Sequence, residues 1–241
     1  MLIASVEVQV LSSAQIETYI LRKMQILAHR GWNMDINKQT NWSENSLSAF
    51  DLAQSHPDIT GVEIDIRRHP TTGKIVLSHD PIVANMKYLT LDKALEVVSK
   101  QNWQTVIEFK EYDRGLFDEV ANLVNKYNLC TKSTLFAFGD IAQNFPWQKR
   151  QKLNLGIIAE YPWQIAQTVR TYQPDTLLLG WDERPWTFIA FATWWSIFDL
   201  RKVTKKYNIQ LVAGVAQSTS QLNWARKIGV TTITADMQLI R

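Results

Sequence analysis

The chain has 241 residues, a length that suits one large domain or two small ones. Hydrophobic residues make up 46% of it and charged residues 20%, proportions that exclude a disordered protein. The formal net charge of +3 is too small to indicate a nucleic-acid-binding protein, so we expect no nucleic-acid partner. The single cysteine, Cys130, excludes an intrachain disulfide and fits a reducing compartment.

No targeting segment is expected in this sequence. The first residues contain Glu7 and lack a basic flank before a long apolar run, so they do not resemble a signal peptide. The longest aromatic and aliphatic stretch, Pro185–Leu200, contains Thr, Ser and Asp and is too short to span a bilayer. We therefore expect a cytoplasmic protein.

Short apolar or β-branched runs alternate with helical patterns along the chain, a rhythm that is typical of α/β proteins. Nine runs are candidate strands: Gln25–His29, Gly61–Ile66, Lys74–His79, Thr105–Phe109, Thr134–Phe138, Leu155–Ala159, Thr176–Gly180, Gln210–Val215 and Thr231–Thr234. Helices are expected between them, including Glu44–Gln54, Leu91–Ser99, Leu116–Tyr127, Trp163–Thr171, Phe198–Tyr207 and Thr219–Ile228.

The spacing of the runs reduces the nine candidates to eight. Parallel neighbours need a connection of about a dozen residues or more, but only residues 67–73 separate the second and third runs. Pro70–Gly73 has the composition of a turn, so Lys74–His79 is expected to be a local excursion after the second strand. The remaining eight strands predict a single-domain (β/α)₈ TIM barrel. An open doubly wound sheet is the alternative, but no glycine-rich phosphate loop follows the first strand.

The barrel is expected to occupy residues 24–241. Met24 directly precedes the first strand, so residues 1–23 are interpreted as an N-terminal extension. The alternative is a strand and helix that plug the bottom of the barrel.

Two carboxylates lie two residues apart in the second strand. Glu63 and Asp65 therefore face the same side, where like charges would repel and raise each other's pKa. A divalent cation would remove this conflict, and Glu108 on the next barrel strand could supply a third oxygen ligand. The alternative is that the carboxylates pair with Arg67, Arg68 or Lys110.

Two of the four histidines, His29 and His79, follow apolar runs near these carboxylates. Such a pair suits general acid–base catalysis near neutral pH, although a histidine at a strand end is often structural. Arg30 could bind a phosphate through two hydrogen bonds, or it could form a surface salt bridge. The other two histidines, His56 and His69, each precede a proline and are expected at the surface in turns.

Five segments, taken in order, resemble the glycerophosphodiester phosphodiesterase family, which shares a superfamily with phosphatidylinositol-specific phospholipase C. They are AHRGW (28–32), ENSLSAF (44–50), GVEIDIR (61–67), IVLSHD (75–80) and IEFK (107–110), and GVTTITAD (229–236) is similar to the last strand of the family. The resemblance implies a TIM barrel that hydrolyses phosphodiesters with a divalent metal.

The resemblance also implies roles for particular residues. His29 and His79 would be the acid–base pair, and the cofactor would be Mg²⁺ or Ca²⁺. Arg30 and Lys110 would bind the phosphate. The metal ligands would be Glu63, Asp65 and Glu108, and Glu44 and Asn45 would line or brace the site, with Glu44 orienting Arg30.

The sequence departs from the family pattern at three places. Ser43, which also suits a helix N-cap, stands where the family usually has proline. Only residues 81–107 separate the His-Asp and Glu-x-Lys motifs, so the family's usual insertion over the substrate site is absent. Leu211–Gly214 does not match the tryptophan-containing motif expected near the seventh strand.

These features leave three functional hypotheses. The first is an enzyme that cleaves a glycerophosphodiester, a small molecule, to an alcohol and a glycerol phosphate. The second is a phospholipase-type phosphodiesterase that acts on a lysolipid or a lipid headgroup. The third is an inactive barrel that binds phosphodiesters without turning them over.

An aromatic segment, Trp186–Phe198, follows the strand Thr176–Gly180 and bears on the choice between the first two hypotheses. Phe191, Trp194, Trp195 and Phe198 fall on one helical face, which is the pattern of a core helix. Trp186 and Phe188 precede that face, and they are expected to form an apolar wall of the substrate site in place of the missing insertion. Tryptophan is favoured at membrane interfaces, so the segment also predicts peripheral membrane contact.

Overall fold

The computed structural model of the protein describes residues 24–32, 44–148, 152–181, 185–199 and 201–236. The predicted extension, residues 1–23, lies outside the described residues, as does the predicted N-cap Ser43.

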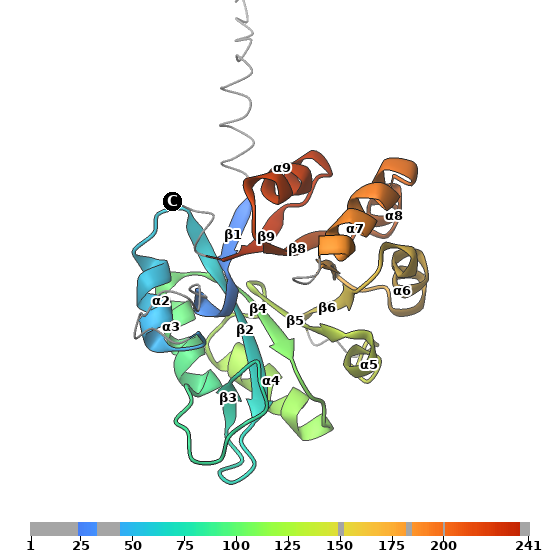
Figure 1. Ribbon diagram of the computed structural model, residues 1–241. Helices are drawn as coiled ribbons and strands as arrows, with labels where there is room; N and C mark the ends of the chain where they lie inside the picture. Colours follow the sequence, from blue (N-terminus) through green and yellow to red (C-terminus); the bar gives the residue numbers. More distant parts are fainter. Residues whose placement is uncertain (1–23, 33–43, 149–151, 182–184, 200, 237–241) are drawn as a thin grey trace, which may run out of the picture.

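Eight parallel strands close into a barrel (Figure 1). Each pairs in parallel with its neighbours, and the first pairs with both the second and the last, which closes the ring. They are β1 (Gln25–Ala28), β2 (Ile59–Arg68), β4 (Gln104–Phe109), β5 (Ser133–Phe138), β6 (Asn154–Ala159), β7 (Thr176–Gly180), β8 (Gln210–Ala216) and β9 (Thr232–Ala235). The predicted TIM barrel is confirmed.

The ninth strand, β3 (Ile75–Leu77), lies outside the barrel ring. It pairs antiparallel with the end of β2, with Ile66 opposite Leu77 and Arg68 opposite Ile75. The predicted local excursion is therefore confirmed as a β-hairpin. The hairpin matters for function because it returns the chain to the carboxyl end of β2 at His79.

Helices surround the barrel in the order of the sequence (Figure 1). They are α2 (Leu47–Gln54), α3 (Leu91–Gln101), α4 (Arg114–Lys126), α5 (Gly139–Ala142), α6 (Ile165–Tyr172), α7 (Pro185–Ile197), α8 (Arg201–Tyr207) and α9 (Thr219–Lys227), with 3₁₀ turns η1 (His29–Gly31) and η2 (Pro162–Gln164). The segment 81–107 holds one helix, α3. Among the described residues, no helix combines the length and the apolar character needed to cross a membrane.

Helix α2 begins three residues after the predicted start at Glu44. Asn45 has a left-handed backbone conformation, with φ of 54°, which a helix cannot continue through. Ser46 follows it in an extended conformation, and its hydroxyl accepts a hydrogen bond from the backbone N–H of Ala49. Ser46 is thus the N-cap of the helix.

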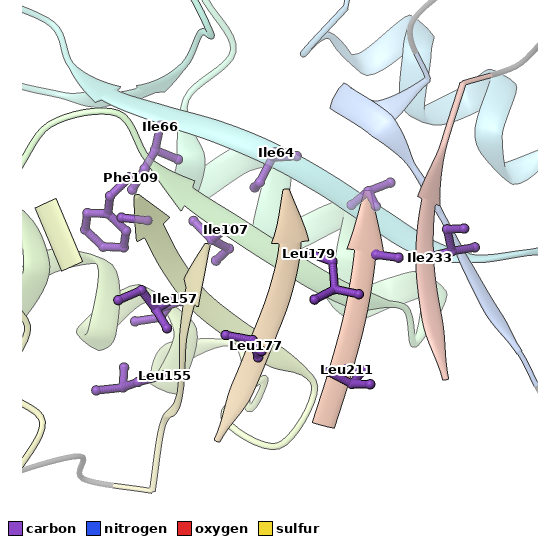
Figure 2. Packing of buried hydrophobic residues seen from close by; sticks show 14 of the residues in the cluster. Ile64, Ile66, Ile107, Phe109, Leu155, Ile157, Leu177, Leu179, Leu211 and Ile233 are labelled. Carbon is purple, nitrogen blue, oxygen red and sulfur yellow. The ribbon is translucent and has the colours of Figure 1, made fainter. Parts of the chain in front are cut away.

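Alternate residues of each strand face the helices or the barrel interior, because successive side chains point to opposite faces. The outward residues form the larger buried cluster, part of which is shown in Figure 2 with Ile64, Ile107, Ile157 and Leu177 labelled. The inward residues form a separate apolar layer made of Leu27, Val106, Phe136, Ile158, Leu178 and Val212. This layer is the floor on which the polar groups at the carboxyl ends of the strands stand.

A glycine on β2 allows the close strand pairing that positions the site. A Cβ atom on Gly61 would overlap the backbone oxygen of Gln104 on β4. We expect Gly61→Ala to lower the free energy of unfolding by about 2 kcal/mol or more, because backbone must move to admit the methyl group. Urea unfolding measures this, with Gly139→Ala as the matched control, since a Cβ there meets no atom within 4 Å. Equal stability of the two variants would contradict the close packing at Gly61.

Candidate active site

The carboxyl ends of the barrel strands surround a cavity of about 580 Å³. Six of the nine predicted site residues line it: His29, Arg30, Glu63, His79, Glu108 and Lys110. The other three lie directly behind them, because Glu44, Asn45 and Asp65 bond to Arg30 or to each other. Residues that are far apart in the sequence therefore converge on one cavity.

Three carboxylates lie together at the base of this cavity. Strand alternation turns Glu63 and Asp65 inward from β2, and the strand register places Glu108 of β4 opposite Asp65. All three residues are buried, and one oxygen of each lies within 4.8 Å of the others. Buried carboxylates at this spacing need cations to offset their charge.

Two permanent cations contact this cluster. Lys110 Nζ lies 3.0 Å from Asp65 Oδ1 and also bonds to Glu108. Arg30 Nε lies 3.3 Å from Asp65 Oδ2, and its Nη1 donates to both oxygens of Glu44, at 3.0 and 3.2 Å. The salt bridge that was the alternative for Arg30 thus exists, but it lies inside the site and fixes the guanidinium at the cavity wall.

The cations are shared unequally among the carboxylates. Burial, together with the neighbouring charges of Asp65 and Glu108, raises the pKa of Glu63 to about 8. Burial also raises the pKa of Glu108, to about 7, although Lys110 opposes the shift. Burial disfavours the Asp65 anion too, but Lys110 and Arg30 outweigh it and lower the pKa of that carboxyl. Two cations therefore do not neutralise three carboxylates.

The donor set fits a divalent cation. Carboxylate oxygens are the ligands that Mg²⁺ and Ca²⁺ prefer, and a cation between Glu63 and Glu108 would offset the charge that Arg30 and Lys110 leave. Asn45 adds an independent observation: its Nδ2 donates to Asp65 Oδ2 at 3.4 Å, while its buried Oδ1 lacks a hydrogen-bond partner among the described residues. A neutral acceptor oxygen beside the carboxylates suits a cation or its bound water.

The first candidate catalytic histidine, His29, is held from two sides. Its Nδ1 is 2.8 Å from Asp236 Oδ1, and its Nε2 is 3.8 Å from Glu63 Oε2. Burial disfavours the charged ring, but the hydrogen bond to Asp236 and the charge of Glu63 outweigh it and raise the pKa of His29. Barrel closure creates this contact, because β1 pairs with β9, which ends next to Asp236.

The second candidate, His79, reaches the cavity from the loop after β3. Its Nδ1 is 2.9 Å from Asp80 Oδ1, and the guanidinium of Arg67 donates two hydrogen bonds to its backbone carbonyl. Asp80 is 85% exposed at its side chain, whereas Asp236 is 21% exposed. The two His–Asp pairs therefore differ in how strongly solvent screens them.

A third histidine, His69, lies in a turn as the sequence predicted, but it is not at the surface. His69 is buried rather than solvent-facing, and its Nδ1 accepts hydrogen bonds from the backbone N–H groups of Thr71 and Thr72. These bonds stabilise the turn between β2 and β3, so the role of His69 is structural.

The wall opposite the charged residues is apolar. It is formed by Phe136, Phe138, Ile158, Leu178, Trp181 and Val215 from β5 to β8 and the residues that follow them. The prediction that Trp186 and Phe188 form this wall is wrong, since neither lines the cavity and Phe188 packs behind Trp181 with ring centroids 5.4 Å apart. Trp181 takes their place because it directly follows the end of β7.

A second cavity, of about 720 Å³, adjoins the first. The two share Glu108, Lys110, Phe138 and Ile158, and the second continues between α5 and α6 to Tyr172. Because α5 has only four residues, the helix layer leaves room there. A substrate held at the charged wall can therefore extend in this direction.

Sequence reasoning missed Asp236 and Trp181 as site residues. Both directly follow an apolar strand, as His29 does, and this position was the available signal. The sequence indicated only a strand for the segment that contains Asp236. It predicted the apolar wall at Trp186 and Phe188, beyond Trp181.

Comparisons with solved structures find the fold of this barrel in phosphodiesterases, while no protein-family model and no curated protein matches the sequence. A glycerophosphodiester phosphodiesterase from Parabacteroides distasonis superposes with a TM-score of 0.65 at 14% identity over 89% of this chain and 93% of its own. A putative one from Galdieria sulphuraria gives 0.64 at 14% identity, over 88% and 93%. An Oleispira antarctica phosphodiesterase, in complex with the product sn-glycerol-3-phosphate, gives 0.62 at 18% identity, over 88% and 92%. The fold of the chain is thus that of glycerophosphodiester phosphodiesterases.

Binding of a divalent cation to the carboxylates should depend on pH in a defined direction. With a pKa near 8, Glu63 carries a proton at neutral pH that the cation must displace, so binding strengthens as pH rises. We expect Mg²⁺ or Ca²⁺ to raise the thermal midpoint of chelator-treated protein more at about pH 9 than at about pH 6. Glu63→Gln should lose most of this increase, whereas Glu119→Gln, on the exposed surface of α4, should keep it. A midpoint that does not respond to either metal would contradict the site.

Proposed function

We propose that this protein is a metal-dependent phosphoric diester hydrolase that cleaves a glycerophosphodiester to an alcohol and a glycerol phosphate. The observation that carries the proposal is the convergence of two histidines, two cations and three carboxylates on one cavity. The shared fold with glycerophosphodiester phosphodiesterases supports it, as does the sn-glycerol-3-phosphate complex of one structural neighbour.

The phosphate of the substrate binds at the charged wall of the cavity. Arg30 donates hydrogen bonds to its oxygens, and the contacts of Arg30 with Glu44 and Asp65 keep the guanidinium in place. Lys110 supplies a second positive charge from the floor of the site. Glu63, Asp65 and Glu108 would hold Mg²⁺ or Ca²⁺, which when bound supplies positive charge for the developing phosphorane.

The two histidines move the protons. One takes a proton from the attacking oxygen, which is either water or a neighbouring hydroxyl of the substrate, and the other donates a proton to the leaving alkoxide. The bond between Nδ1 of His29 and Asp236 leaves Nε2 on the side of Glu63, next to the phosphate site. Attack by a substrate hydroxyl would produce a cyclic phosphate that water then opens.

The apolar wall favours a second candidate substrate. Phe136, Ile158, Leu178 and Trp181 offer contacts that suit a hydrocarbon chain, which the headgroup of a small glycerophosphodiester lacks. A lysolipid phosphodiester would place its phosphate at Arg30 and its chain along this wall. Turnover of glycerophosphodiesters and lysolipids by the same preparation distinguishes the two candidates by their kcat/KM.

Removing either histidine should abolish most of the turnover. We expect His29→Ala and His79→Ala each to lower kcat by about 10²- to 10⁴-fold, because each removes one proton-transfer group. The rate of glycerol phosphate release at saturating substrate measures this. His56→Ala, which changes a histidine outside the cavity, is the control and should keep the wild-type rate. Wild-type turnover in either cavity variant would remove that histidine from the mechanism, and wild-type protein that binds diesters without cleaving any would indicate the inactive binding barrel.

The two aspartates that contact the histidines should differ in importance. Asp236→Asn is expected to lower kcat by about 100-fold with little change in KM, because an amide cannot stabilise the buried imidazolium. Asp80→Asn should lower it by less than about 10-fold, because solvent screens the exposed pair. Steady-state kinetics of both variants test the difference. Equal effects would show that burial does not set the strength of the His29–Asp236 interaction.

A further inference from the structure

Helix α7 carries an apolar outer surface. No charged residue occurs between Pro185 and Phe198, although a helix on the outside of a barrel normally presents polar residues to solvent. Phe191 and Trp195 are buried against the barrel, so core packing explains the apolar residues on the inward side of the helix. The outward side exposes Trp186, Ile189 and Ile197 and has no charged residue, although it also exposes the hydroxyl residues Thr193 and Ser196.

We name this surface the aromatic face and define it by Trp163, Trp186, Ile189, Ile197 and Phe198. These side chains are between 46% and 67% exposed. Trp163 belongs to η2, which packs against α7, and the other four belong to α7 or directly follow it. Patches of large exposed apolar residues on soluble proteins usually mark an interaction site.

The rings of the aromatic face are connected rather than scattered. Tyr161 stacks on Trp163 with centroids 4.9 Å apart and on Trp186 at 5.8 Å. Trp163 also meets Trp194 at 5.9 Å, and Trp194 meets Phe198 at 4.9 Å. This row of rings runs from η2 along α7, so the face is held in one arrangement before any partner binds.

The aromatic face begins at the end of the barrel where the catalytic cavity opens. η2 starts at Pro162, just after β6 ends at Ala159, and α7 starts at Pro185, just after β7 ends at Gly180. Trp181 connects the two regions, because it lines the cavity and packs against Phe188 of α7. A partner on the aromatic face would therefore lie close to the cavity mouth.

A basic helix continues the aromatic face. α8 begins three residues after Phe198 and carries four exposed basic residues, Arg201, Lys202, Lys205 and Lys206. Arg201 is paired with Asp199, and Arg201 and Lys205 line a cavity with the starts of β1, β8 and β9, so Lys202 and Lys206 supply the charge on the outer side of the helix. The stretch from Pro185 to Asn208 holds one acidic residue, Asp199. Figure 1 shows α7 and α8 next to one another in the ring of helices. Positive charge beside an apolar surface is complementary to anionic lipid.

We propose that the aromatic face and α8 dock on the surface of an anionic phospholipid bilayer. Tryptophan and tyrosine rings settle at the boundary between headgroups and hydrocarbon, isoleucine and phenylalanine enter the hydrocarbon, and the lysines face the phosphates. A protein partner would also cover apolar residues, but the bilayer accounts for the rings and the basic helix together. The docking is independent of the proposed phosphodiesterase activity.

Flotation of the full chain with lipid vesicles tests the proposal. We expect the wild type to float with vesicles of phosphatidylcholine and phosphatidylglycerol, and more weakly with phosphatidylcholine alone. Ile189→Glu combined with Ile197→Glu should lower partitioning by about 10-fold or more, because charge is placed in the hydrocarbon. Lys202→Glu combined with Lys206→Glu should weaken only the binding to anionic vesicles, and salt should reduce that difference.

A matched control uses exposed apolar residues elsewhere on the molecule. Val83 and Met86, 55% and 58% exposed, lie between β3 and α3, so Val83→Glu with Met86→Glu should float like the wild type. Quenching of wild-type tryptophan fluorescence by brominated phosphatidylcholine, in vesicles that also contain phosphatidylglycerol, provides a readout that needs no variant. Absence of flotation and of quenching would overturn the proposal. An equal loss of vesicle binding in the Val83 and Met86 variant would also overturn it. So would a wild-type protein that sediments as a dimer, if the Ile189→Glu and Ile197→Glu variant sediments as a monomer.

Discussion

Repulsion among three buried carboxylates is the constraint on which the rest of the site depends. Glu63, Asp65 and Glu108 stand on two paired strands, so the barrel itself holds their charges together. The neighbouring groups reduce this repulsion. Lys110 and Arg30 form ion pairs with Asp65, and Asn45 donates a hydrogen bond to it. The backbone N–H of Arg30 donates to Glu63. Arg30 is also shared with Glu44, so Arg30 and Lys110 do not balance the carboxylates, and the proposed divalent cation would offset the remaining negative charge.

The cavity is divided between two kinds of chemistry by the position of strands in the ring. β1, β2, β4 and β9 contribute or precede the charged residues, whereas β5 to β8 present apolar side chains to the same space. Because the strands are fixed by pairing, the charged wall and the apolar wall of the cavity lie on different strands of the ring. The apolar wall continues through Trp181 to α7, so the interior and the exterior of the barrel are apolar on the same side.

The sequence predicted the barrel and most of the residues around its cavity. Parallel strands covered by helices appear in a sequence as short apolar runs, and the polar residues of a site follow the ends of these runs. His29 and Glu108 lie near the ends of such runs, whereas Glu63 was predicted from its spacing of two residues from Asp65. The pairing of β1 with β9 follows from the predicted barrel, but only the structure shows that it brings the side chains of His29 and Asp236 into contact. The start of α2 depends on the left-handed backbone of Asn45, which helical periodicity does not reveal. The orientation of α7 was predicted in part: Phe191 and Trp195 are buried as their spacing indicated, whereas Phe198 is 51% exposed.

The measurement that tests the account most directly is the metal dependence of phosphodiester cleavage. ³¹P NMR follows a glycerophosphodiester with wild-type protein that was treated with a chelator and then titrated with Mg²⁺ or Ca²⁺. The account predicts no cleavage before the titration and the appearance of glycerol phosphate as the metal is added. Full cleavage by the chelator-treated protein would contradict the central role assigned to the three carboxylates.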